Sequence, residues 1–242
     1  MRERRVTAVK AIFKREMHAY FTSALGYAYL FLFLVFTGLA FYFTSIQTGL
    51  SSLATFFTVA AYLSPLLLPL LTVRIFSEDR KLKTDQLLLT APVSTTGVVM
   101  GKFLAAFAMF GIGVAITLIY PLIQSRYGIV PVSETVCAYI GYILFAALIL
   151  SVGAFMSSLT ENQITAAALT YVVVVVIIAV VFAVNIIPSE VVVYTALWLS
   201  PVNRFMNFLH GRLNISDAVY LASISGLFLF LTVQSFEKRR LG

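Results

Sequence analysis

The side chains best suited to chemistry lie in one charged segment, residues 74–102, which reads RIFSEDRKLKTDQLLLTAPVSTTGVVMGK. The segment ends in GVVMGK, which has the outline of a phosphate-binding loop. The two glycines are one residue too close together for that loop, however, and Phe103 occupies the position of the Ser or Thr that would hold magnesium. We therefore expect no nucleotide site in this chain.

Enzymatic motifs are also missing from the rest of the sequence. It contains no HExxH, no GxSxG and no pair of carboxylates inside an apolar run, so protease or hydrolase chemistry lacks its residues. A single cysteine, Cys137, excludes an intrachain disulfide and argues against a zinc site. The sequence predicts no catalytic residue, no cofactor site and no metal site.

The charged segment instead has the pattern of a docking helix. Ser77 is placed to cap a helix that extends to about Leu89. Glu78 and Asp79 would then occupy the first turn, where carboxylates face the positive end of the helix dipole. Asp79 and Lys83 are four residues apart with the acid first, which is the favourable order for an ion pair.

The opposite side of this predicted helix is apolar, because Ile75, Leu82 and Leu89 recur every seven residues. A helix with one apolar face and one charged face is typical of a loop that docks on a partner protein at a membrane surface. A solvated connector is the alternative interpretation, since most runs of charge are hydrated surface.

The rest of the chain is too apolar for a soluble protein. Of its 242 residues 60% are hydrophobic and 11% charged, and the mean hydropathy is +0.96, whereas a soluble domain carries about a quarter charged residues. The net charge of +7 could indicate nucleic-acid binding, but the basic residues lie beside apolar runs. We expect an integral membrane protein that contacts lipid and no nucleic acid.

Apolar runs of about 20 residues predict six crossings of the membrane. Residues 17–73 contain no Asp, Glu, Lys or Arg and are too long for one crossing, and the polar patch Ser45–Ser52 divides them in two. Pro65 and Pro69 would kink the second crossing unless neighbouring helices satisfy the freed carbonyls. The expected spans are residues 25–44, 56–73, 103–125, 135–160, 164–187 and 218–236.

Residues 188–217, between the last two spans, predict a short helical hairpin. Its charge-free part, Val191–Asn203, has 13 residues and is too short to cross a bilayer. A Ser-Pro pair would break this part, and Phe205 and Phe208 then give a second short apolar face. We expect a hairpin that re-enters the membrane part-way from the outside.

The first 22 residues predict an amphipathic helix that lies in the headgroup plane, because Val9, Phe13 and Met17 recur on one side of a basic segment. With the N-terminus inside, the inner segments hold 14 Lys and Arg and the outer segments hold 3. The positive-inside rule therefore places both termini in the cytoplasm, which agrees with an even number of crossings.

The expected spans contain no Asp, Glu, Lys or Arg away from their ends. Ion-coupled transporters need such residues at membrane depth, so the chain has no identifiable energy source of its own. A transporter of this kind needs a motor in trans, and the charged loop is where it would dock. The alternative is an ATP-independent membrane channel or scaffold subunit; an intramembrane enzyme would lack its catalytic residues.

Three segments in the same order resemble the ABC-2 type membrane permeases, and in particular their gliding-motility-associated, GldF-like branch. These segments are IFKREMHAYFTSALGY at residues 12–27, the charged segment at residues 74–102, and LSPVNRFMNFLHGRLNISDAVY at residues 199–220. The charged segment shares the family's acidic pair, basic residues, leucines, Pro-Val and Gly-Lys. It departs from the family at Lys83, where glycine is common, and at Asp85, where Glu is common. We expect Lys83 to make the helix more regular than glycine would.

The resemblance implies an all-α integral membrane fold of the ABC-2, or type V exporter-like, kind. Residues 1–242 would form a single transmembrane domain with an N-terminal interfacial helix (1–22), a cytoplasmic coupling loop (74–102) and an outer re-entrant hairpin (188–217). The chain would be the permease subunit of an ATP-binding cassette transporter in a bacterial cytoplasmic (inner) membrane. It would couple ATP hydrolysis to substrate export or to an extracytoplasmic partner.

The resemblance also implies partners and contact residues. The partners are a cytoplasmic ABC ATPase dimer that binds ATP and Mg²⁺, a second permease copy or a related permease, and a possible GldG-like extracytoplasmic subunit. The implied ATPase-coupling residues are Glu78, Asp79, Arg80, Leu82, Thr84, Asp85, Leu88 and Glu161. The implied outer-hairpin residues are Phe205, Phe208 and Gly211.

Overall fold

The computed structural model of the chain describes residues 2–49, 52–81, 83, 94–183 and 190–241, with residues 2–8, 183 and 239–241 described by their backbone alone. All regular secondary structure in these ranges is helical. The predicted all-α fold is confirmed for the described residues.

Six helical segments in the described ranges are long and apolar enough to cross a membrane, which confirms the predicted number. They are α2 (Ala24–Phe41) with the π-helical turn η1 (Tyr42–Ile46), α3 (Ala54–Lys81), α5 (Thr95–Thr117) with its continuation α6 (Ile119–Gln124), α7 (Val132–Leu159), α8 (Gln163–Ala183) and α11 (Ile215–Leu241). The other helices are α1 (Arg2–Thr22), α9 (Glu190–Leu199) and α10 (Pro201–Leu209). Residues 184–187 of the fifth predicted span lie outside the described residues.

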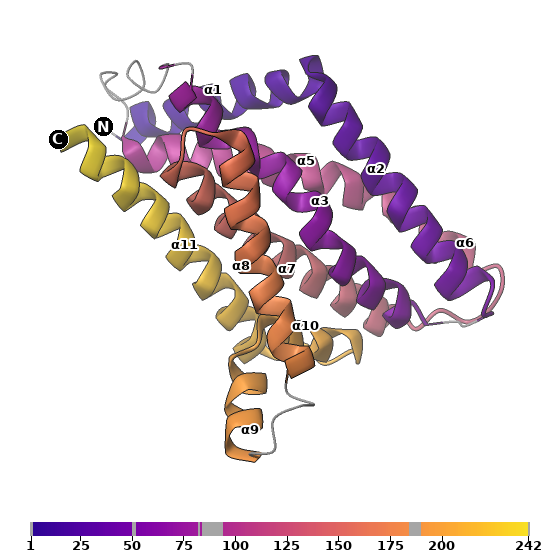
Figure 1. The fold of residues 1–242 in the computed structure, drawn as a ribbon. Coiled ribbons are helices and arrows are strands. Elements are labelled where there is room, and N and C mark those ends of the chain that lie inside the picture. The colour runs from indigo at the N-terminus through magenta and orange to yellow at the C-terminus, as the bar shows by residue number, and fades with distance from the viewer. Residues whose placement is uncertain (1, 50–51, 82, 84–93, 184–189, 242) are drawn as a thin grey trace.

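The helices form one bundle with two distinct ends. Figure 1 shows both chain termini at one end, together with α1, and shows α6, α9 and α10 at the other. A side-chain contact agrees with this arrangement: Thr95, at the start of α5, donates from Oγ1 to Oε1 of Glu237, near the end of α11 (3.0 Å). We call the end with both termini the terminal end and the opposite end the far end.

α7 and α3 form the centre of the bundle. α7 contacts α3, α8, α10 and α11. In its most apolar stretch 72% of the residues are buried, compared with 17% in the corresponding stretch of α8. The two central helices approach closely at Gly153 of α7, where a Cβ atom would lie 2.1 Å from Oγ1 of Thr72 in α3. A larger residue at this position would push α3 away from α7.

α1 crosses the terminal end of the bundle, as Figure 1 shows. Its Ile12 is buried against Gly101 of α5. Its Tyr20 hydroxyl donates to the main-chain carbonyl of Leu71 in α3 (2.7 Å). Burial raises the pKa of Tyr20, so this phenol stays neutral and keeps its proton to donate. The apolar side of α1 is therefore covered by protein.

The hairpin between α8 and α11 contains two helices separated at the predicted Ser-Pro pair. Ser200 caps α10 by accepting a hydrogen bond from the Asn203 N–H (3.4 Å), and Pro201 takes the first helical position, where its missing N–H costs nothing. α9 has no buried residue, whereas α10 packs on α7. Re-entry of this hairpin into a membrane stays a prediction.

The predicted helix start at Ser77 is wrong. α3 runs without interruption through Ser77 to Lys81, and the buried Ser77 hydroxyl donates to the carbonyl of Val73, one turn earlier. Glu78 and Asp79 therefore occupy the end of a helix, where the dipole disfavours carboxylates. Arg74, one turn earlier in α3, compensates Glu78. Lys102 of α5 and Arg15 of α1 compensate Asp79, and the sequence around Asp79 contains no sign of these two cations.

The chain leaves α3 through Lys83, whose backbone is left-handed (φ +57°) and whose N–H donates to the carbonyl of Arg80 (3.1 Å). The expectation that Lys83 makes a helix more regular is therefore wrong. Lys83 also lacks the helical backbone that would place it one turn after Asp79 for an ion pair. Glycine suits this conformation better, because it has no Cβ to clash with the following carbonyl.

We predict that Lys83→Gly raises the free energy of unfolding by up to about 1 kcal/mol, because it relieves the left-handed backbone. The measurement is the midpoint of thermal unfolding in detergent, which should rise. Lys81→Gly is the matched control: it changes the same residue type in the last helical turn and should lower stability by about 1 kcal/mol. A fall in the midpoint for both variants would contradict this account.

Candidate functional site

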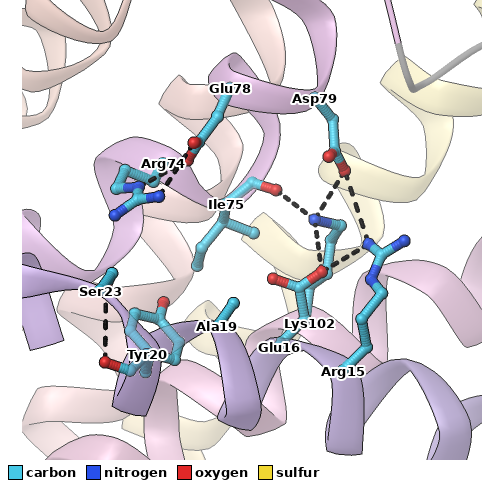
Figure 2. Close-up of a pocket in the computed structure, with 10 residues that line it drawn as sticks. All are labelled: Arg15, Glu16, Ala19, Tyr20, Ser23, Arg74, Ile75, Glu78, Asp79 and Lys102. Carbon is cyan, nitrogen blue, oxygen red and sulfur yellow. Dashed lines mark hydrogen bonds and ion pairs between the residues drawn. The ribbon is translucent and has the colours of Figure 1, made fainter. Parts of the chain in front are cut away.

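A concentrated group of charges lies at the terminal end around Lys102 of α5, whose side chain is only 2% exposed. Its Nζ donates to the carbonyl of Ile75 in α3 (2.6 Å) and lies 2.8 Å from Oδ2 of Asp79 and 3.0 Å from Oε1 of Glu16. Figure 2 shows the ammonium group between these two carboxylates. One lysine thus joins α5 to both α1 and α3.

The surroundings of Lys102 match the three N–H donors of an ammonium group. One carbonyl accepts a hydrogen bond from it and two carboxylates lie within ion-pair distance of it, and the ring of Phe76 lies 5.5 Å from Nζ. A buried ammonium group without such partners would be very costly. We name Lys102, Glu16, Asp79 and Arg15 the Lys102 cluster; Arg15 lies 2.6 Å from Oε1 of Glu16 and 3.9 Å from Oδ2 of Asp79.

A cavity of about 310 Å³ opens beside the Lys102 cluster. Arg74 and Glu78 also line it, and they bind each other through two contacts of 2.5 and 2.9 Å. The cations that line the cavity are already paired with its carboxylates, so the lining carries balanced charge and its ion pairs hold α1, α3 and α5 together. The lining residues are Arg15, Glu16, Ala19, Tyr20, Ser23, Arg74, Ile75, Glu78, Asp79 and Lys102.

A second contact at the terminal end joins α3 to the turn between α7 and α8. Arg80 donates from Nη1 to the Ser158 carbonyl (3.2 Å), and its Nη2 lies 3.4 Å from Oε1 of Glu161. One turn deeper, the Ser157 hydroxyl of α7 hydrogen-bonds to the main chain of α3. The end of α3 is therefore fixed on both sides, by the Lys102 cluster and by this turn.

The structure brings together four of the residues implied as coupling contacts. Glu78, Asp79, Arg80 and Glu161 all lie at the terminal end. Leu82, Thr84, Asp85 and Leu88 lie outside the described residues.

The four described residues differ in how available they are to a partner. Glu161 is 71% exposed, whereas Arg80 is 13% exposed and Asp79 20% exposed. Asp79 and Arg80 already bind within the chain, and Glu78 binds Arg74. Glu161 is thus the best placed of the four to meet a partner, and the contact itself stays a prediction.

Two of the three residues implied for the outer hairpin, Phe205 and Phe208, hold α10 against α7. Phe205 and Phe208 are fully buried. The Phe205 ring stacks on Phe145 of α7 with 5.3 Å between centroids, and Phe208 covers Gly141 of α7. Gly211 then turns the chain with φ +70°, a conformation that favours glycine.

Sequence reasoning missed a buried ion pair, Arg204–Asp217, within this hairpin. Asp217 is 1% exposed and accepts hydrogen bonds from Arg204 Nη1 (2.7 Å) and Asn207 Nδ2 (2.9 Å). Arg204 also donates from Nε to the carbonyl of Trp198 in α9 (3.1 Å) and lies over the Trp198 ring. An Arg within the hairpin and an Asp at its end are the sequence signal for such an ion pair.

The Lys102 cluster has a weaker signal in the sequence. Glu16 is an acid within a basic helix, and Lys102 follows a glycine at the start of an apolar run. Neither feature indicates that the two side chains meet. Within the described ranges, no group of three or more His, Cys, Asp or Glu side chains is placed to hold a metal ion.

We predict that Lys102→Met lowers the free energy of unfolding by about 3–5 kcal/mol, because it leaves two carboxylates facing each other without their buried cation. The measurement is unfolding of the purified chain in detergent by heat or urea. A triple variant that combines it with Glu16→Gln and Asp79→Asn removes the three charges together, and it should recover most of the loss.

Lys81→Met is the control for this series, because Lys81 is exposed on the last turn of α3. It should change stability by no more than about 0.5 kcal/mol. If the triple variant were as unstable as Lys102→Met alone, uncompensated charge would not be the reason for the loss.

Comparison with known proteins agrees with this architecture. Residues 21–209 match the model of a family described as ABC-2 family transporter protein. The matched region extends from the end of α1 through α10 and so includes most of the chain. No curated protein matches the chain.

Proposed function

The chain belongs to the ABC-2 transporter family, and from this premise we propose that it is the membrane-spanning permease subunit of an ATP-binding cassette transporter. A separate cytoplasmic ATPase dimer binds ATP and Mg²⁺ and supplies the energy. The permease subunit uses that energy to export a substrate or to act on an extracytoplasmic partner.

The observation that carries the proposal is the contact between Arg80 and Glu161 (3.4 Å). These residues belong to two segments that the family resemblance implies as ATPase contacts, and they are 81 positions apart in the sequence. Because the two segments lie side by side at the terminal end, one surface of an ATPase can engage both. We define this docking face by Arg80, Lys81, Lys83 and Glu161.

The contacts of α3 offer a route from the docking face into the bundle. The Lys102 cluster ties the end of α3 to α1 and α5, and Ser157 ties it to α7. Tyr171 of α8 donates to the carbonyl of Leu66, further along α3 (2.9 Å). Movement of the end of α3 by an ATPase would therefore displace four neighbouring helices together.

Further assignments extend this proposal. We place the chain in a bacterial cytoplasmic membrane with the terminal end in the cytoplasm, because most of its Lys and Arg belong to segments at that end. We propose a second permease copy or a related permease as its membrane partner, and a GldF-like assembly with a GldG-like extracytoplasmic subunit. The resemblance of the three sequence segments supports that finer branch.

The alternative is a channel or scaffold that works without ATP. It shares the six spans and the apolar surface, but it gives no role to an exposed face that joins the end of α3 to the turn at Glu161. The two functions differ in whether an ATPase accompanies the chain.

We predict that purification of this chain from its native membrane in mild detergent recovers a nucleotide-binding subunit with ATPase activity. Glu161→Arg should reduce the recovered subunit about tenfold, because it reverses an exposed charge on the docking face. The measurements are mass spectrometry of the eluate and its rate of ATP hydrolysis.

Glu190→Arg is the matched control, because Glu190 is an exposed acid on α9 at the far end. It should leave recovery unchanged. If no ATPase accompanies the chain even after chemical cross-linking, the channel or scaffold function replaces the proposed one.

Cysteine labelling in intact cells tests the proposed orientation, with the terminal end in the cytoplasm. Thr48→Cys, exposed near the far end, should react with a membrane-impermeant thiol reagent, and Lys83→Cys at the terminal end should not. The natural Cys137 is buried and should give little background. Labelling of Lys83→Cys alone would reverse the proposed orientation.

A further inference from the structure

An apolar groove of about 570 Å³ lies at the far end between α6 and the start of α7. Its walls include Leu122 (68% exposed), Ile129 (92%) and Val132 (71%). A volume of this size is within the usual range of about 300–1,000 Å³ for sites that bind small molecules. The other lining residues are Leu118, Pro121, Ser125, Gly128, Val130, Thr135, Val136 and Tyr139.

The hydroxyl groups that line this groove already donate to main-chain carbonyls. Ser125 donates to Leu122 (2.7 Å) and Thr135 to Pro131 (3.0 Å). Tyr139 donates to Thr117 (2.8 Å). The groove therefore offers little to a sugar or a peptide, whose polar groups would lose water without gaining partners. A hydrocarbon chain carries no such cost.

The position of the groove in the bundle indicates the source of that hydrocarbon chain. α6 is the last part of a 30-residue candidate span, and α7 begins another. The groove thus lies beside the last turns of one span and the first turns of the next, at the depth of the acyl chains and headgroups of the leaflet opposite the termini. Figure 1 shows α6 at this end.

A cation borders the groove along the chain. Arg126 is exposed and lies in the turn between the lining residues Ser125 and Gly128. Within the described ranges no ion pair occupies its guanidinium group. Glu134, the carboxylate nearest in sequence, instead accepts a hydrogen bond from Ser52 (3.4 Å).

We propose that this groove binds one anionic phospholipid of the leaflet opposite the termini, with an acyl chain in the groove and the phosphate at Arg126. An acyl chain gains little by leaving bulk lipid for an equally apolar protein surface. Preference for this lipid over its neighbours therefore comes from the charge at Arg126. The proposed lipid site depends on the six spans and not on the ATPase partner. The lipid site and the proposed permease function can therefore each fail without the other.

The test reconstitutes the full chain in phosphatidylcholine vesicles that contain a trace of lipid with a photoactivatable acyl chain, either phosphatidylglycerol or phosphatidylcholine. After illumination, mass spectrometry locates the label. We expect the phosphatidylglycerol probe to label residues 118–139 about fivefold more than the phosphatidylcholine probe does. Arg126→Gln should abolish this difference without lowering labelling by phosphatidylcholine.

A second variant tests the groove itself. Val132→Trp combined with Val136→Trp fills it and should reduce its labelling by both probes at least threefold. The matched control is Val172→Trp with Val176→Trp on the exposed face of α8 (60% and 58% exposed), which should leave the groove labelling unchanged.

Three outcomes would overturn the proposal. The first is groove labelling no greater than that of the exposed face of α8, which would indicate ordinary boundary lipid. The second is an unchanged headgroup preference in Arg126→Gln. The third is absence of label together with cross-links from the groove to a second copy of the chain, which would make protein the occupant.

Discussion

The buried ammonium group of Lys102 is the interaction on which the terminal end depends. At 2% exposure it cannot be left unpaired, and its partners are the carboxylates of Glu16 in α1 and Asp79 in α3 and the carbonyl of Ile75 in α3. The observed position of α5 therefore depends on its contacts with α1 and α3. This requirement makes α1 an integral part of the bundle, although its basic, amphipathic sequence is typical of a separate surface helix.

α3 is the element that connects this end to the rest of the molecule. It contains two prolines, and side chains from four other helices bind its main chain: Tyr20, Lys102, Ser157 and Tyr171. In lipid such contacts matter more than in water, because no solvent is available to satisfy a freed carbonyl. The same contacts are the ones through which the proposed ATPase would act on the bundle. At Gly153 α7 approaches α3 so closely that a Cβ atom would lie 2.1 Å from Oγ1 of Thr72.

Hydropathy was sufficient to predict the six spans, because long apolar runs have few alternatives in a membrane. The capping pattern failed at the end of α3, where Ser77 followed by two acids has the pattern of a helix start. Those acids are stable at a helix end only because Lys102 and Arg74 reach them, and Lys102 comes from another helix. The left-handed Lys83 was missed for a related reason: the residue favours helix locally, and only the observed turn shows otherwise. Local patterns thus predicted the elements, and at the end of α3 the ion pair with Lys102 accounts for an acid that the pattern had placed at a helix start.

The central claim is that an ATPase binds the docking face. Cross-linking this face to its neighbour in the native membrane tests that claim most directly. A photoreactive amino acid at Lys81, exposed at the end of α3, would be activated in intact membranes, and mass spectrometry would identify the protein joined to it. The same probe at Tyr194, exposed on α9 at the far end, reports the opposite face. The account predicts that the probe at Lys81 captures a subunit that hydrolyses ATP and that the probe at Tyr194 does not. Capture at Lys81 of lipid alone, or of a protein without nucleotide-binding activity, would contradict it.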